Sequence, residues 1–400
     1  MISYTYANIP YYHSLFNGLN LRPGDIKHIE DLEKIPILNK ATVKKKLDKF
    51  WPNDLRPFSY YLRSTGGSTG SPLVYRVSRK DRFLSAALLY RGWSHAGYGM
   101  GDSMFFLGGS SIGASASSTI SRYLNELTRN IVKLSSFDMK ESQMHQYVSK
   151  INAVRPYFAF GYASSLYFFS KWIEHEDLTI HSPKSIFVTA EKLFPHARKK
   201  IEDVFGTSVY DNYGVNDGGV SAYECPRHEG LHIDTERSIM EVVDEGGHQL
   251  SSGSGRIIAT SLHNYAMPFI RYDTGDIGTL SEELCSCGRG QKLLKDIIGR
   301  QQDILVTPEG NNIHGEFFTH IFWAVKGVKE FQVVQRTVDA ITISIIPEEE
   351  FDERSVQKIK DAVATRSKEW FVDVRIVDRI DRTKAGKYRW VINDTGADRY

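Results

Sequence analysis

Cysteine is scarce in this sequence, and long apolar runs are missing from it. Three cysteines among 400 residues argue against a disulfide scaffold and favour a reducing compartment. No apolar run reaches the length that a membrane-spanning helix needs, and residues 1–6 lack the basic flank and apolar core of a signal peptide. We therefore expect a cytoplasmic protein without a membrane span.

Neither sign of charge is in excess. The 50 basic and 48 acidic side chains leave a formal net charge of +2, so no strong field favours nucleic acid or an anionic membrane surface as a partner. With 41% hydrophobic and 24% charged residues, the composition is that of an ordinary globular protein. A chain of 400 residues normally forms two or three domains with a large core.

The most distinctive stretch is Ser-Thr-Gly-Gly-Ser-Thr-Gly-Ser-Pro at residues 64–72. Glycines let the backbone approach a ligand closely, successive N–H groups can cradle an anion, and the hydroxyl groups add donors. The stretch predicts either a phosphate-binding loop or a solvated turn rich in serine and glycine. It is not the P-loop of nucleoside triphosphatases, because no lysine follows the last glycine.

Strand and helix signals alternate through the middle of the chain. The spacing of Phe83, Ala87 and Tyr90 predicts a helix over 80–96. Further helices are expected around 144–151, 164–174 and 195–205, and buried strands at 104–107, 157–160, 185–188 and 208–210. This order predicts an α/β fold, in which a parallel sheet has helices on both faces. Ligands bind such sheets where loops leave the carboxyl ends of the strands, so the candidate site loops are 108–111, 161–163, 189–191 and 212–214.

From about residue 220 the pattern becomes β-rich, with short strands expected at 239–243, 255–260 and 269–272. The last hundred residues predict a small α+β unit. In it Ile341, Ile343 and Ile345 alternate as in a half-buried strand, a helix follows around 356–363, and a second alternating strand follows at 372–376. We predict an N-terminal domain over 1–300 and a C-terminal domain over 301–400.

Five stretches, taken together and in this order, resemble motifs of the adenylate-forming enzymes, the superfamily of acyl-CoA synthetases and luciferases. They are residues 65–72, 213–217, 271–276, 299–303 and 383–389. Three others resemble the phenylacetate–CoA ligase branch, namely 8–12, 189–191 and 285–289, and the short chain is similar to the members of that branch found in capsule-synthesis loci. The resemblance implies a large N-terminal domain joined by a hinge to a mobile lid domain.

The resemblance also implies a reaction. ATP and Mg²⁺ would activate a small carboxylic acid as an acyl-adenylate with release of pyrophosphate, and the acyl group would then pass to CoA. A carrier protein, an amine or a sugar hydroxyl is an alternative acceptor, and a non-catalytic nucleotide-binding subunit is the alternative from another class. We keep a homodimer as one option for assembly.

Residue roles follow from the same resemblance. Ser68 and Thr69 would hold the β- and γ-phosphates, and Gly70 beside them is also expected to bind the cofactor. Asp217 would help to hold Mg²⁺, and Lys387 would bridge the carboxylate and the α-phosphate. We expect Lys387, Asp217 and Thr69 to be the catalytic group. A mobile ammonium suits the first of these because it can deliver a compact charge to a transition state.

The nucleoside would be held by residues of four other segments. Ala190 and Glu191 would flank the adenine, with Tyr213 stacked on its face. Asp276 would accept hydrogen bonds from the ribose, and Arg300 would support ribose and phosphate. Two further cofactor-binding residues are expected beside Tyr213, and these are Asp211 and Asn212.

The chain departs from the family pattern at three positions. Ser71 stands where lysine is frequent, Asp217 stands where glutamate is usual, and Gln302 stands at the hinge position. The acid pocket is expected on the loops at the strand ends. Its predicted lining is Phe106, Gly108, Gly109, Tyr162, Asn212 and Gly214.

The three cysteines form a second group of interest with His232. Cys285 and Cys287 direct their thiolates into the same space if the chain turns there, and Cys225 can join them. Three thiolates and one imidazole make a closed tetrahedral zinc site of a structural kind, and relatives in the branch can carry one. His228 is a less favoured fourth ligand, because it falls in a turn, and three free cysteines are the alternative.

Overall fold

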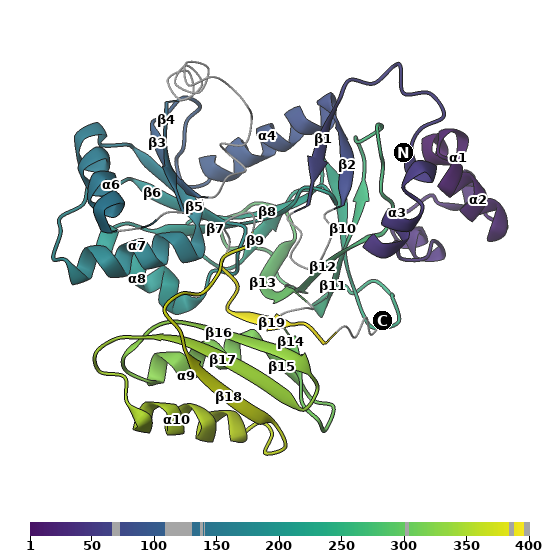
Figure 1. Cartoon of the computed structure of the whole chain (residues 1–400). Coiled ribbons are helices and arrows are strands. Elements are labelled where there is room, and N and C mark those ends of the chain that lie inside the picture. The colour runs from purple at the N-terminus through teal and green to yellow at the C-terminus, as the bar shows by residue number, and fades with distance from the viewer. Residues whose placement is uncertain are drawn as a thin grey trace. The chain divides into compact units, whose positions relative to one another are not determined.

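The chain divides into two compact units, Met1–Ile297 and Ile298–Tyr400. The structure, a computed structural model, describes residues 1–65, 73–108, 130–136, 139, 141–300, 304–383 and 388–395. An 11-stranded mixed sheet organises the first unit, and a four-stranded mixed sheet organises the second. Figure 1 shows both sheets with their helices. The fold is therefore α/β, as the sequence predicts.

One half of the large sheet is parallel. Its five strands lie in the order β4 (Ile131–Ser135), β3 (Met104–Gly108), β5 (Phe158–Tyr162), β6 (Ser185–Thr189) and β7 (Val209–Val215). A row of aromatic side chains crosses four neighbouring strands in register, because Phe106 pairs with Phe160, Phe160 with Phe187, and Phe187 with Tyr210. Residues that pair across neighbouring strands lie on the same face of a sheet. The row therefore shows which residues at the ends of these strands lie on the same face.

Within the part of the chain that the structure describes, three helices connect the parallel strands. They are α6 (Glu141–Val154), α7 (Ala163–His175) and α8 (Pro195–Phe205), each within a few residues of its prediction. Pro195 opens α8 at its first position, where a missing N–H costs nothing, and Gly206 ends it in the left-handed region at φ 64°. Met144, Val148 and Ile151 are the buried residues of α6, so the predicted stripe is confirmed.

Helix α4 (Arg79–Ser94) confirms the helix predicted over 80–96. Phe83 is 60% exposed, whereas Leu88 and Trp93 are buried. The reason lies at Gly92, where an added Cβ would stand 2.2 Å from the ring of Tyr223. The helix packs through its glycine against β8, and this rotates Phe83 toward solvent.

The β-rich segment continues the same sheet instead of forming another. Its strands are β8 (Val220–Glu224), β9 (Leu231–Ile233), β10 (Ser238–Val243), β11 (Gly253–Ser261), β12 (Tyr272–Leu280) and β13 (Leu293–Arg300). Two predictions are corrected here. Residues 212–214 are not a loop, because β7 runs on through them and pairs antiparallel with β8. The strand expected at 269–272 begins only at Tyr272 and runs on through residues 273–276.

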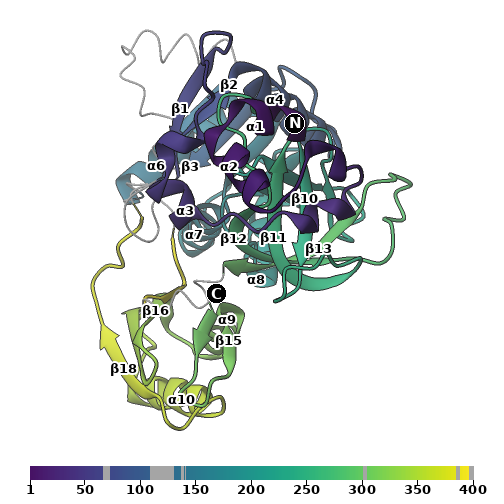
Figure 2. The same ribbon diagram turned by 90° about the vertical axis from the view of Figure 1, so that its right-hand side faces the viewer.

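The N-terminal segment packs against this part of the sheet. It contains α1 (Ile2–Asn8), α2 (Pro10–Gly18), α3 (Lys40–Lys45) and three short 3₁₀ helices, Pro23–Asp25, Glu30–Lys34 and Leu47–Phe50. Tyr12, Phe16 and Phe50 are fully buried with Phe269 and Tyr272 in one hydrophobic cluster. In Figure 2, α1 and α2 lie in front of β10 and β11. Aromatic burial therefore holds the segment on the sheet.

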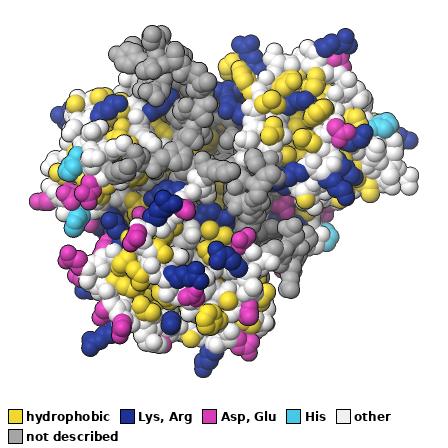
Figure 3. Space-filling model, viewed as in Figure 1, with side chains coloured by type: hydrophobic (Ala, Val, Ile, Leu, Met, Phe, Trp, Pro, Cys, Tyr) yellow, Lys and Arg dark blue, Asp and Glu magenta, His cyan; other side chains and the backbone are white. Residues whose placement is uncertain are grey.

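A separate two-stranded ribbon follows the N-terminal segment. Strands β1 (Tyr60–Ser64) and β2 (Val74–Ser78) pair antiparallel, with Ser64 opposite Val74. The inner residues of β2 are buried, but Leu62 is 65% exposed. Figure 3 shows hydrophobic side chains together with lysine and arginine over this part of the surface. The register places the ends of the ribbon on either side of the glycine-rich stretch.

The second unit has its own core. Its elements are β14 (Ile304–Val306), β15 (Asn312–His314), α9 (Gly315–Ala324), β16 (Val328–Thr337), β17 (Ala340–Pro347), α10 (Glu353–Ala364), β18 (Phe371–Ile376) and β19 (Val391–Asn393). Ile341, Ile343 and Ile345 are buried as expected, whereas Ile376 is 56% exposed because β18 is an edge strand. Among the described residues of both units, no helix is long and apolar enough to cross a membrane.

Candidate functional site

The carboxyl ends of the parallel strands meet at one edge of the large sheet. Tyr162 ends β5 opposite Thr189 at the end of β6, and Thr189 lies opposite Asn212 in β7. The side chain of Asn212 is buried and donates from Nδ2 to the Val188 carbonyl oxygen at 3.0 Å. This edge is where ligands bind in sheets of this type, and we call it the strand-end edge.

Two tyrosine–aspartate hydrogen bonds connect β12 to the strand-end edge. The Tyr213 hydroxyl donates to Asp276 Oδ2 at 2.9 Å, and the Tyr272 hydroxyl donates to Asp217 Oδ2 at 2.7 Å. Asp217 lies in the turn between β7 and β8, so each bond joins β12 to the end of β7. The structure thus brings together three of the predicted nucleotide and metal residues from segments about sixty positions apart in the sequence.

Ala190 and Glu191 leave the end of β6 in a constrained turn. Ala190 has φ 72°, a left-handed conformation that is uncommon for a residue with a side chain. Glu191 Oε2 accepts a hydrogen bond from the backbone N–H of Ser164, in the first turn of α7, at 2.9 Å. The turn is thereby held against α7, and strained backbone of this kind is frequent at binding sites.

The predicted acid-pocket residues are mostly buried in the sheet. The rings of Phe106 and Tyr162 meet edge to face at 6.3 Å, and both side chains are 5% exposed. A Cβ on Gly108 would stand 2.1 Å from the Phe106 ring, so glycine is required where that ring folds back. Gly214 lies in β7 and is exposed. Gly109 falls outside the described residues.

Asp211 and Asn212 lie on opposite faces of β7, because successive strand residues alternate. Asp211 faces a hollow whose lining includes Lys192, Arg198, Glu224, His228 and Lys295. Its backbone N–H donates to Glu224 Oε2 at 2.8 Å, and Arg198 donates to both oxygens of Glu224 at 2.9 and 3.0 Å. Burial, followed by the charge of Glu224, raises the pKa of Asp211 to about 7.

Several predicted residues lie outside the part of the chain that the structure describes. These are Ser68, Thr69 and Gly70 of the glycine loop, Lys387 of the C-terminal loop and the hinge residues 301–303. Arg300 ends β13, and its side chain is not described. The flanks of the glycine loop are described, and there Thr65 N donates to the Leu73 carbonyl oxygen at 3.0 Å.

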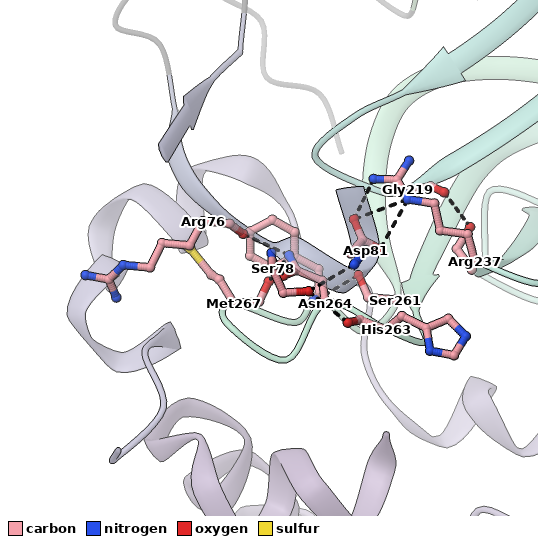
Figure 4. A network of polar contacts seen from close by, with 11 residues as sticks. Arg76, Ser78, Asp81, Gly219, Arg237, Ser261, His263, Asn264 and Met267 are labelled. Atoms are coloured by element: carbon pink, nitrogen blue, oxygen red, sulfur yellow. Dashed lines mark hydrogen bonds and ion pairs between the residues drawn. The ribbon is translucent and has the colours of Figure 1, made fainter. Parts of the chain in front are cut away.

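A buried polar network that sequence reasoning missed holds the start of α4. Arg237 donates to both carboxylate oxygens of Asp81, with Nη2 at 2.7 Å from Oδ2, and both side chains are nearly inaccessible to solvent. Asn264 accepts from Ser78 N at 2.9 Å and donates to the Arg76 carbonyl oxygen at 2.9 Å. Figure 4 shows how these residues join β2 and α4 to the strands behind them.

The predicted metal group is assembled in the structure. The ligand atoms of Cys225, His232, Cys285 and Cys287 all lie within 4.8 Å of one another. Cys225 Sγ is 3.6 Å from Cys285 Sγ, and Cys287 Sγ is 3.5 Å from His232 Nε2. Two ligands at about 2.3 Å from a tetrahedral zinc ion would lie roughly 3.8 Å apart, so the donor set and its spacing fit zinc.

His228 takes another role. Its ring stacks on Tyr210 with 5.0 Å between the centroids, and its Nδ1 lies 3.3 Å from Glu224 Oε1. Within the described residues it is not part of the cysteine–histidine group. The alternative assignment of His228 as the fourth ligand is therefore not supported, and His232, which is fully buried, is the histidine of the group.

Comparison with known proteins agrees with this architecture. A solved structure of 2-hydroxyisobutyryl-CoA ligase in the postadenylation state, in complex with R3-HIB-AMP, superposes with a TM-score of 0.76 at 18% identity over 98% of this chain and 86% of that one. The phenylacetate-coenzyme A ligase of Thermus thermophilus is 25% identical over 98% of this chain and 94% of its own length. That of Escherichia coli is 26% identical over 76% of this chain and 70% of its own.

The fold and these similarities define the class. The chain is a distant homologue of the AMP-forming acyl-CoA ligases and is placed in the adenylate-forming superfamily. Within that class it is phenylacetate–CoA ligase-like, and residues 305–394 match the family described as the CapK C-terminal domain. The resemblance predicted from the five stretches is confirmed.

Proposed function

We propose that the protein activates a carboxylic acid with ATP, forms an acyl-adenylate with release of pyrophosphate, and transfers the acyl group to a thiol such as that of CoA. The observation that carries the proposal is the pair of bonds Tyr213–Asp276 and Tyr272–Asp217 at the strand-end edge. Residues assigned to adenine, ribose and Mg²⁺ thereby converge at one place. An aromatic face can stack on a purine base, and carboxylate oxygens can accept hydrogen bonds from ribose hydroxyls.

In this proposal two tyrosines and two aspartates bind the nucleotide and its metal ion. The Tyr213 ring covers one face of the adenine, and the Asp276 carboxylate accepts from the ribose hydroxyls. Asp217 holds Mg²⁺, which offsets phosphate charge, and its bond from the Tyr272 hydroxyl orients the carboxylate. The aspartate is one methylene shorter than glutamate, so its reach to the metal can include a water molecule.

The second proposed ligand is one zinc ion held by Cys225, His232, Cys285 and Cys287. With four protein ligands the ion has no open position, so its role is structural. It would join the end of β8 and strand β9 to the connection between β12 and β13. The ion would also stabilise thiolates in a setting where burial raises the pKa of Cys285 to about 12.

The test is a screen of aryl, amino and short hydroxy acids for ATP–pyrophosphate exchange. We expect exchange that depends on Mg²⁺ and on one class of acid. Thr69→Val and Asp276→Ala should weaken nucleotide binding without unfolding the protein, whereas Thr279→Val, farther along β12, should leave it unchanged. Unchanged ATP affinity in both site variants would contradict the site assignment.

One alternative has a specific basis in the departures Ser71 and Asp217, which weaken phosphate and metal binding. In this alternative the protein binds nucleotide as a non-catalytic subunit of a biosynthetic complex. ATP binding without exchange for any acid would favour it. Exchange with one acid, followed by acyl transfer to a carrier protein, an amine or a sugar but not to CoA, would keep the enzyme and change only its acceptor.

A further inference from the structure

A lysine outside the five motifs reaches the base of the glycine loop. Lys40 Nζ donates to Thr65 Oγ1 at 2.9 Å. The same oxygen accepts from the backbone N–H of Leu73 at 3.0 Å, on the other side of the loop. A hydroxyl oxygen has two acceptor sites, and both are used here. Lys40 therefore lies at the closing residue pair of the ribbon.

The backbone that carries Lys40 is fixed to the strand that carries Asp276. Leu38 bridges β12, because its N–H donates to the Arg271 carbonyl oxygen at 2.8 Å and its own carbonyl oxygen accepts from Asp273 N at 2.9 Å. The Arg271 guanidinium donates to the carbonyl oxygens of Ile35 at 3.0 Å and Gly247 at 2.7 Å. The segment preceding Lys40 is thus held from two sides.

The start of helix α3 is fixed as well. Asn39 is its N-cap, and Asn39 Oδ1 accepts from Thr42 N at 2.8 Å. Such a cap sets where the helix begins, and Lys40 is the first residue of the helix. The backbone of Lys40 is therefore fixed at both the preceding segment and the start of the helix.

The glycine loop itself has no positive charge. Residues 64–72 contain no lysine and no arginine, so backbone N–H groups and hydroxyls are its donors. A polyphosphate carries several negative charges, and charge-assisted hydrogen bonds are stronger and shorter than neutral ones. A lysine ammonium supplies a compact charge with three donors, and Lys40 brings one to Thr65 from another segment.

We propose that Lys40 binds the β- or γ-phosphate of ATP at the base of the glycine loop. The inference rests on the proposed function, since it assumes that the nucleotide binds at the strand-end edge. Lys40 lies outside the five motifs, so it would be an additional positive charge at the phosphates. It also explains how a loop with serine at position 71 handles a polyphosphate, because the charge comes from the N-terminal segment.

The test compares ATP with AMP on purified full-length variants by titration calorimetry. Lys40→Met removes the ammonium and retains an apolar stem, Lys40→Arg retains the charge, and Lys45→Met is the matched control on the exposed end of the same helix. We expect Lys40→Met to weaken ATP binding about 10- to 100-fold with AMP binding unchanged. Lys40→Arg should recover part of the loss, and Lys45→Met should behave as the unmodified protein.

Thermal unfolding of the same variants distinguishes a role of Lys40 in phosphate binding from a role in stabilising the ribbon through Thr65. If Lys40→Met lowers the melting temperature but binds ATP as tightly as the unmodified protein, the lysine only closes the ribbon and the inference is wrong. Equal losses for ATP and AMP would also overturn it. Failure of the unmodified protein to bind either nucleotide would instead overturn the proposed function itself.

Discussion

At the scale of single residues, burial strongly perturbs the pKa of Asp211, one of the predicted site residues. Its pKa of about 7 stands above the ordinary value near 3.9, so the folded chain holds the proton more tightly than the unfolded chain. The resulting stability is fully present below about pH 4 and is lost as the pH rises through about 7. A charged Asp211 therefore costs stability at alkaline pH.

Asp211→Asn should reverse this cost. The amide cannot ionise, so we expect the variant to melt at a higher temperature than the unmodified protein at pH 8 and to lose that advantage toward pH 5. Asp203→Asn is the control, because Asp203 pairs with Lys199 at 3.0 Å on the exposed side of α8. A melting-temperature difference that is the same at every pH from 5 to 8 would contradict the assignment.

Buried ion pairs show what no local pattern could predict. Asp81 and Arg237 are 156 positions apart, and neither has a neighbour that signals the partner. Arg271 was placed in a motif by resemblance, but its side chain donates to Glu241 Oε1 at 3.1 Å and to two backbone oxygens. Pairs of this kind depend on tertiary contact, so only the folded chain reveals them.

At the scale of elements, periodicity and turn residues predicted most helices and strands of the large unit. Helix α8, with Pro195 at its start and Gly206 after its end, is such a case. The sequence predicts a strand at 208–210 followed by a loop at 212–214, yet pairing with β8 extends β7 through these residues to Val215. The spacing of Phe83, Ala87 and Tyr90 predicts helix α4, whereas the close approach of Gly92 to the Tyr223 ring decides which face of the helix is buried. In both cases a tertiary contact decides what local propensity leaves open.

The cysteine–histidine group would join the end of β8 and strand β9 to the connection between β12 and β13. We expect metal analysis to find one zinc ion per chain, and we expect Cys287→Ser to lose the ion and lower the melting temperature. Ser286→Ala is the control, since Ser286 contacts Glu229 and not the group. Its melting temperature should change little and its zinc should remain. Protein purified without chelators that contains no zinc would contradict the site.

At the scale of the whole molecule, the two units have separate cores, and the predicted catalytic lysine and the glycine loop belong to different units. Lys387 follows β18 in the second unit, and Asp217 and Asp276 belong to the first. A single arrangement would have to keep Lys387 at the nucleotide through both half-reactions. The resemblance implies instead that the second unit turns about Gln302 after adenylation, which would give the acceptor thiol access.

Lys387→Ala should therefore affect the two half-reactions differently. Loss of one positioned donor to developing charge costs roughly 10²- to 10³-fold in rate, so acyl-adenylate formation should fall by at least that factor. Transfer from chemically prepared acyl-adenylate to the acceptor should stay near the unmodified rate. Gln302→Pro should slow transfer to the acceptor and leave acyl-adenylate formation near the unmodified rate, because a fixed φ resists the hinge rotation. Lys384→Ala, in the same loop as Lys387, is the control. Single-turnover measurements of each step test this, and equal slowing of both steps by Lys387→Ala would rule out a two-arrangement mechanism.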